Sequence, residues 1–239
     1  MSRAASISGF PEWLPEQQIV QDQFVAHVRR KFELHGFAPL ETRAVEPLST
    51  LQQKGADADK QIYVLQHSGS EGDEADQLGL HFDLTVPFAR FVAERAGKLT
   101  FPLKRYQIQR AWRGERPQEG RYREFVQADI DVVSRGTLPL IHDIELPGIA
   151  VEILDELPIP EVTVQVNNRK LVHGFCEGIG IADILGTMRI IDKLDKAGPA
   201  KVGELLAASC SSERSRSCWR SARSPPTTTA SASRWPGSA

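Results

Sequence analysis

The chain has 239 residues, of which 41% are hydrophobic and 25% charged, and its formal net charge is −2. These values are typical of a globular protein with one large domain or two small ones, and they give no general reason to expect nucleic-acid binding. The sequence has no apolar N-terminal run typical of a signal peptide and no apolar window of about eighteen residues that could span a membrane. Three cysteines (Cys176, Cys210 and Cys218) without a CxxC pair favour a reducing, cytoplasmic location.

The six histidines are scattered along the chain and show neither HxxH nor HExxH spacing. Metal sites usually bring their ligands together at such spacings. We therefore expect surface or core histidines and assign no metal ligand from the protein.

The first quarter of the chain predicts one long helix followed by extended segments. The helix begins at Pro15, carries apolar residues four positions apart on one stripe, and ends before Gly36. Residues 37–45 and 61–66 are predicted to be extended. The acidic, Gly/Ser-rich segment 67–77 has no period and is predicted to be a surface loop.

The middle and end of the chain predict strands in succession and then helices. Leu78–Asp83 reads as a strand, and Thr85 is a suitable N-cap for a helix that Gly97 ends. Successive strands with hairpin-like links predict an α+β fold built on a mainly antiparallel sheet flanked by helices. The other predicted elements are strands at 104–113, 124–133 and 161–167, and helices at 143–157, 169–178 and 187–196.

The segment AWRGERPQEGRYREFVQADIDVV, residues 111–133, packs arginines and glutamates beside a strand with regular alternation. A period of two places four apolar residues, Val126, Ala128, Ile130 and Val132, on one face. The opposite face carries Phe125, Gln127, Asp129 and Asp131.

Two interpretations of that second face are open from the residues alone. It is either a solvated strand face with salt-bridging neighbours or a ligand site, in which arginines bind phosphate, the ring stacks on a base, and an aspartate binds an ammonium group.

The segment RGERPQEGRYREF resembles the second signature motif of class II aminoacyl-tRNA synthetases, and in detail it is similar to the histidyl-tRNA synthetase family. Three further segments resemble the same family in the same order: HFDLTVPFARFVA, VNNRKLVHGF and RIIDKLDKAG. The resemblance runs from about Gly9 to Leu206 and points to the eukaryotic-like branch of the family.

The resemblance implies a role for each matching residue. Arg113 is expected to contact the α-phosphate of ATP as the catalytic residue, and Asp131 to read the imidazole ring of histidine. The remaining expected ATP contacts are Glu115 at the adenine, Arg121 at the γ-phosphate and Phe125 stacked on the base. The remaining expected histidine contacts, at the ammonium group, are Asp83, Thr85 and Gln127.

The resemblance also implies ATP and Mg²⁺ as cofactors, histidine and tRNA(His) as substrates, and a homodimer. RKFELHGFAPLETRAVEP fits the first class II motif in outline, but Arg43 stands where that motif has its proline, which weakens the dimer prediction.

Residues 209–239 break with the composition of the rest. They contain ten serines and five arginines against one glutamate, which is a net charge of +4 and leaves −6 for residues 1–208. Neither helix nor strand period survives there. We expect a partial catalytic domain at 1–208 and a disordered, out-of-frame tail at 209–239, so that the chain is an inactive, truncated form. The alternative is a non-catalytic regulatory subunit of ATP phosphoribosyltransferase in histidine biosynthesis.

Overall fold

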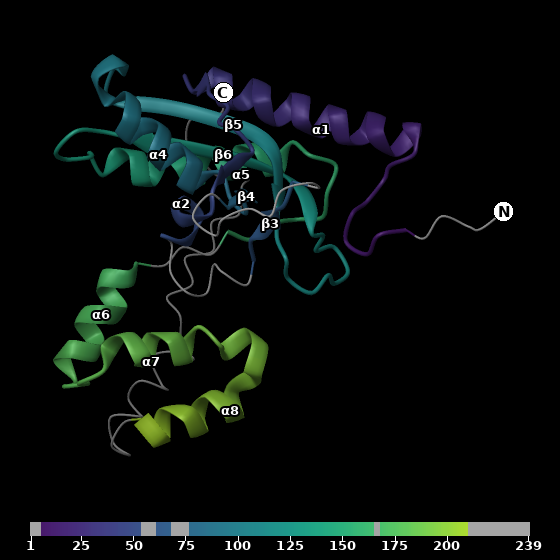
Figure 1. Ribbon diagram of the computed structural model, residues 1–239. Coiled ribbons are helices and arrows are strands. Elements are labelled where there is room, and N and C mark those ends of the chain that lie inside the picture. The colour runs from purple at the N-terminus through teal and green to yellow at the C-terminus, as the bar shows by residue number, and fades with distance from the viewer. Residues whose placement is uncertain (1–5, 54–60, 68–76, 165–167, 210–239) are drawn as a thin grey trace. The chain divides into compact units, whose positions relative to one another are not determined.

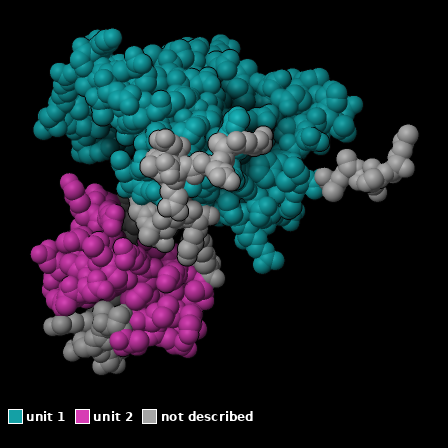
Figure 2. All heavy atoms as spheres, in the orientation of Figure 1, with its two compact units in different colours: residues 1–160 teal, residues 161–239 magenta. Residues whose placement is uncertain are grey.

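The computed structural model describes residues 6–53, 61–67, 77–164 and 168–209. The chain divides into two compact units, Met1–Pro160 and Glu161–Ala239 (Figure 2). The predicted tail lies outside the described residues except for Ser209, so the division at 208/209 stays a prediction. None of the helices in the described ranges is long and apolar enough to cross a membrane.

The described part of unit 1 contains two small sheets, and the long β5–β6 hairpin dominates the larger one (Figure 1). β5 (Leu103–Trp112) pairs antiparallel with β6 (Glu124–Val133), and β1 (Ala38–Pro39) pairs parallel with β5. The second sheet is antiparallel, with the order β2-β4-β3. Its strands are β2 (Val45–Pro47), β3 (Tyr63–Leu65) and β4 (Leu78–Leu80). The α+β, mainly antiparallel prediction is confirmed.

Two long helices pack on one face of the β5–β6 hairpin and form the main core with it. α1 (Pro15–Leu34) begins with proline, as predicted, and is followed by Gly36 at φ 77°, a left-handed conformation that glycine adopts without strain. α5 (Ile141–Asp155) supplies the other helix of this layer. The buried residues of this core are Phe32, Phe37, Tyr106, Ile149 and Ile153.

The alternation predicted for residues 124–133 is confirmed as a strand, but its apolar face is only partly core. Ile130 and Val132 pack against the buried core residues. Val126 and Ala128 are exposed, because α1 and α5 cover only the C-terminal half of β6. The apolar alternation therefore predicted on which side of β6 the core lies, but not how far the core extends along the strand.

In its described residues, 161–164 and 168–209, unit 2 forms three helices around a small apolar core. The core residues are Cys176, Ile181, Val202 and Leu206. Asn168 and Asp183 cap α6 and α7, accepting backbone N–H groups at 2.9 and 2.8 Å. The helices are α6 (Arg169–Gly178), α7 (Ile184–Ile191) and α8 (Leu194–Ser209), the last with a kink at Gly198.

Two element predictions in unit 2 were wrong. Residues 161–164 form no strand, and the rest of that predicted strand, 165–167, lies outside the described residues. The helix predicted at 187–196 is in fact α7 and the beginning of α8, because the period of apolar residues continues across the short break between them.

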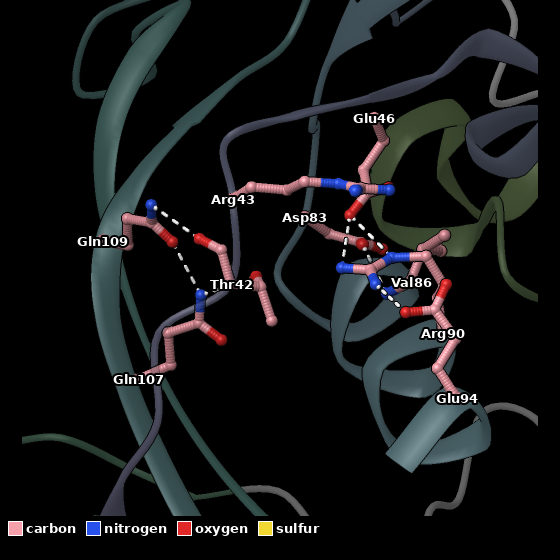
Figure 3. A network of polar contacts seen from close by, with 9 residues as sticks. All are labelled: Thr42, Arg43, Glu46, Asp83, Val86, Arg90, Glu94, Gln107 and Gln109. Atoms are coloured by element: carbon pink, nitrogen blue, oxygen red, sulfur yellow. Dashed lines mark hydrogen bonds and ion pairs between the residues drawn. The ribbon is translucent and has the colours of Figure 1, made fainter.

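A buried carboxylate joins β2 to α4 (Thr85–Arg95) (Figure 3). Glu46 is 0% exposed and binds two guanidinium groups. Arg43 Nε and Nη2 lie 3.1 and 2.8 Å from one of its oxygens, and Arg90 Nε lies 2.9 Å from the other. Arg90 also pairs with Glu94 at 2.6 Å. Arg43, which stands where the first class II motif has its proline, thus has a structural partner.

We predict that Glu46→Ala lowers the free energy of unfolding of unit 1 by about 3–5 kcal/mol, because it leaves the mostly buried Arg90 without its buried partner. Glu94→Ala is the matched control, since it removes the exposed partner of the same arginine and should cost about 1 kcal/mol or less. Urea denaturation of both variants measures the difference. Equal losses would contradict the importance assigned to the buried carboxylate.

Candidate active site

The β5–β6 hairpin brings three of the predicted site residues, Phe125, Gln127 and Asp131, onto one face, here called the polar face. The antiparallel register sets Arg105 opposite Asp131, Gln107 opposite Asp129, Gln109 opposite Gln127 and Ala111 opposite Phe125. Residues directly opposite one another in an antiparallel pair lie on the same side of the sheet. The polar face is therefore Arg105, Gln107, Gln109 and Ala111 of β5 with Phe125, Gln127, Asp129 and Asp131 of β6.

Arg113 follows β5 and extends the polar face at the hairpin end. Its Nε donates to the carbonyl oxygen of Phe82 at 3.0 Å, and one terminal nitrogen donates to Gln127 Oε1 at 3.3 Å. Its guanidinium lies over the Phe125 ring, 4.9 Å from the centroid. Three of the predicted site residues are thus in contact, and the planar group of Arg113 is held in a fixed orientation.

Gln127 links this arginine to the carboxylates farther along β6. Its amide oxygen accepts from Arg113, while its amide nitrogen donates to both oxygens of Asp129, at 3.0 and 2.9 Å. These bonds assign the orientation of the amide, with the oxygen toward the cation and the nitrogen toward the acid.

The hairpin loop between β5 and β6 carries the two other predicted ATP contacts. Glu115 and Arg121 form an ion pair at 2.5 Å, and Arg121 is half exposed. At the base of the loop the Arg113 N–H donates to the Arg123 carbonyl at 2.8 Å. Gly120 turns the chain with φ 71°, which favours glycine. The positive charge of Arg121 in this loop is therefore already neutralised by Glu115.

A segment near the N-terminus is hydrogen-bonded to the beginning of β6 beside this loop. The carbonyl of Gly9 accepts from the N–H groups of Arg123 and Glu124, at 2.7 and 3.1 Å. Gly9 has φ 86°, and a Cβ there would lie 2.8 Å from Cγ of Arg123. The sequence pattern did not identify Gly9, and only its three-dimensional neighbours reveal why glycine is required.

Asp83 and Thr85 lie at the start of α4, and the cap prediction was wrong in detail. The helix begins at Thr85 itself. Asp83 Oδ1 accepts the N–H of Val86 at 3.0 Å, so Asp83 supplies the hydrogen-bond acceptor that an N–H group in the first turn of the helix otherwise lacks. Asp83 is buried, whereas Thr85 is exposed.

Asp131 forms the far end of the polar face, where it pairs with Arg105. Arg105 Nη2 lies 2.6 Å from Asp131 Oδ2. Burial raises the pKa of Asp131 above its usual range, while Arg105 lowers it and the nearby Asp129 and Asp83 raise it. Asp83, Asp129 and Asp131 are thus close enough to interact, although they come from two separate segments of the chain.

Several polar-face residues were missed from the sequence. Gln107 Nε2 donates to the Thr42 hydroxyl at 3.0 Å and to Gln109 Oε1 at 2.6 Å, and Gln109 Nε2 donates to the Thr42 carbonyl at 3.2 Å (Figure 3). The signal was present in RYQIQ, where Arg105, Gln107 and Gln109 alternate with apolar residues, as on the partner strand.

The fold and the arginine-bearing hairpin are those of the N-terminal catalytic portion of a class II aminoacyl-tRNA synthetase. The family model for histidyl-tRNA synthetase matches residues 9–222, and the chain belongs to this family. The match extends into the first residues of the segment predicted to be a tail.

Known proteins agree with this assignment. A histidine–tRNA ligase of Bifidobacterium animalis subsp. lactis is 54% identical over 218 residues, which cover 88% of this chain and 47% of that protein. The crystal structure of histidyl-tRNA synthetase from Nostoc sp. PCC 7120 is similar with a TM-score of 0.77 and 35% identity, over 91% of this chain and 48% of that chain. The chain spans about half the length of the curated relatives it matches.

A third similarity concerns the fold alone. A Bacillus halodurans structure described as an ATP phosphoribosyltransferase regulatory subunit/histidyl-tRNA synthetase has a TM-score of 0.68 and 18% identity, over 91% of this chain and 55% of that one. The relatives that are 50–54% identical are bacterial, so the expected eukaryotic-like branch is not supported.

We predict that Gly9→Ala loosens the start of β6, because its Cβ would meet Arg123 and its φ is unfavourable for alanine. Amide hydrogen exchange at Arg123 and Glu124, whose N–H groups donate to Gly9, should become at least about tenfold faster, which corresponds to roughly 1.4 kcal/mol. Gly97→Ala is the control, since no atom lies within 4 Å of a Cβ there. Unchanged exchange in Gly9→Ala would show that the segment does not hold the strand.

Proposed function

We propose that this chain provides the histidine-activating part of a cytoplasmic histidine–tRNA ligase. In the whole protein, as a homodimer, ATP and histidine would form histidyl-adenylate, and the histidyl group would pass to tRNA(His). The observation that carries the proposal is the polar face, where Arg113 contacts both Phe125 and Gln127 and where Asp131 lies on the same strand.

Arg113 is proposed to act on the α-phosphate of ATP. The histidine carboxylate attacks that phosphorus, pyrophosphate leaves, and negative charge on the phosphate oxygens must be stabilised in between. A planar guanidinium already held by Phe82 and Gln127 needs little reorganisation to donate to those oxygens. Positioning and electrostatics supply most of the rate in such displacements.

The other ATP contacts are proposed for the hairpin loop and the first residues of β6. Arg121 would exchange its ion pair with Glu115 for the γ-phosphate, which would release Glu115 to meet the adenine. Phe125 would stack on the base. Among the described residues no group of three or more His, Cys, Asp or Glu could hold a metal ion, so we assign no protein ligand to Mg²⁺ and propose that it binds through the phosphates.

Histidine is proposed to bind along the acidic part of the polar face. Asp83, with Gln127 and Thr85, would hold the ammonium group, and Asp131 would accept an N–H of the imidazole ring. Three carboxylates close together favour a cationic ligand group, because their mutual repulsion is relieved when it binds. An analogue without the ring nitrogens would leave the partly buried Asp131 carboxylate unpaired and would therefore bind more weakly than histidine.

The regulatory-subunit alternative is supported only by a similarity of fold at 18% identity. The arginines of the hairpin, together with 54% identity to a histidine–tRNA ligase, favour the ligase. Histidine-dependent exchange of pyrophosphate into ATP separates the two functions. Exchange by the chain, alone or joined to the remaining half of a relative, supports the ligase, whereas histidine binding without exchange in both forms supports the regulator.

We predict that Asp131→Ala weakens histidine binding by about 1.5–3 kcal/mol, the usual loss of a charged hydrogen bond, while ATP affinity changes little. Isothermal titration calorimetry on the chain measures both affinities. Asp155→Ala, at the exposed end of α5, is the control. An equal loss for both ligands would place Asp131 in a structural role.

We predict that Arg113→Ala lowers the rate of adenylation by about 100-fold or more, roughly 2.7 kcal/mol, with a smaller effect on substrate binding. The measurement is pyrophosphate exchange in a full-length relative that carries residues 9–206 of this chain. Arg113→Lys should rescue only in part, because lysine lacks the planar fork. Arg110→Ala, on the opposite face of the same hairpin, is the control, and a rate within a factor of two of the parent in Arg113→Ala would exclude the assignment.

A further inference from the structure

Arg105 is a fully buried cation that none of the roles above uses. It is 0% exposed on β5, and its guanidinium lies 4.0 Å from the centroid of the Phe88 ring. One terminal nitrogen donates to Gln107 Oε1 at 3.0 Å, and the other lies 3.4 Å from the Leu84 carbonyl and 2.6 Å from Asp131 Oδ2. Its Nε has no hydrogen-bond partner in the described part of the chain.

Stability alone gives a poor account of this arginine. Burying a guanidinium requires the loss of its hydration, and apolar pairs of similar volume often replace buried ion pairs without loss of stability. The two partners also differ in exposure, because Arg105 is 0% exposed while the Asp131 side chain is 28% exposed. Of the two side chains, only the Asp131 carboxylate is exposed enough to contact a ligand. Arg105 can therefore influence a bound ligand only through Asp131.

Asp131 needs a cation if it is to stay ionised in this position. The charged groups facing it are Arg105 from β5, Asp129 from its own strand and Asp83 from the segment before α4. Burial and both aspartates favour the protonated form of Asp131, and Arg105 alone opposes them. Asp129 is meanwhile held by Gln127 and Asp83 by the start of α4, so neither carboxylate turns away from the site.

We propose that Arg105 is a positioning residue that keeps Asp131 ionised and aimed as the acceptor for the imidazole N–H of histidine. The inference rests on the proposed function, because it takes histidine as the ligand. The fork of Arg105 is fixed by Gln107, Leu84 and Phe88, so the carboxylate that pairs with it is fixed as well. A protonated Asp131 would offer a weaker, neutral acceptor.

The first test needs no ligand. Carbon-13 NMR of the carboxyl group follows the titration of Asp131 in the chain and in Arg105→Met. The Asp131 titration should move to higher pH by about one unit or more, since an opposite charge within contact typically lowers a carboxyl pKa by that much. Lys104→Met is the matched control: it removes a cation from the next position of the same strand, but on the opposite face, where Lys104 pairs with Glu145 at 2.7 Å.

The second test follows histidine binding by calorimetry across the pH range of the Asp131 titrations measured in the first test. In Arg105→Met, affinity should fall about tenfold at pH values between the parental Asp131 titration and that of the variant, and should recover as the pH rises and Asp131 ionises, whereas Lys104→Met should follow the parent at every pH. A loss that is equal at all pH values, or an Asp131 titration unchanged from the parent, would overturn the proposal.

Two further outcomes are distinguishable. If Arg105→Met does not fold, Arg105→Lys decides. The Asp131 titration in Arg105→Lys should stay near that of the parent, because the positive charge is kept, while histidine binding weakens, because the planar guanidinium is lost. Parental histidine affinity in this variant would overturn the role of the guanidinium. If the parent chain binds no histidine while the Asp131 titration still shifts in Arg105→Met, the proposed function fails and the control of Asp131 by Arg105 stands.

Discussion

The antiparallel register of β5 with β6 is the constraint on which the site depends. Ten residue pairs from Leu103–Val133 to Trp112–Glu124 lie in one continuous ladder, which fixes which side chains share a face. A shift of one residue in either strand would move its polar residues into the core against α1 and α5. The core beneath Ile130 and Val132 therefore also holds Gln127 and Asp131 in place on the other side.

The polar face is organised by hydrogen bonds and an ion pair that fix its side chains. Arg113 is anchored on Phe82 and Gln127, Gln127 on Asp129, and Asp131 on Arg105. Arg113, Gln127 and Asp131, which are proposed to touch substrates, are thus each held by a second polar group. Such preorganisation suits a reaction whose rate comes mainly from positioning and electrostatics. It also explains why so many cations lie beside a single strand.

Much of this arrangement could be predicted from the sequence, because it depends on local periodicity. The period-two alternation of residues 124–133 predicted the strand and both of its faces, and Pro15 and Gly36 predicted the ends of α1. What could not be predicted depends on partners distant in sequence. No role was predicted for Arg105 or Gly9, which the fold places beside Asp131 and Arg123. The strand expected at 161–167 is not formed in its described part, residues 161–164, because alternation without a neighbouring strand does not specify a sheet.

The central claim is that the polar face of the β5–β6 hairpin binds histidine. Amide NMR spectra of the chain, recorded while histidine is added and compared with phenylalanine as a ligand without ring nitrogens, test it most directly. The account predicts that histidine shifts the resonances of Asp83, Gln127 and Asp131 and leaves those of α6 to α8 unchanged, and that phenylalanine has little effect at Asp131. Equal shifts with both amino acids, or shifts confined to residues outside the hairpin and the start of α4, would contradict it.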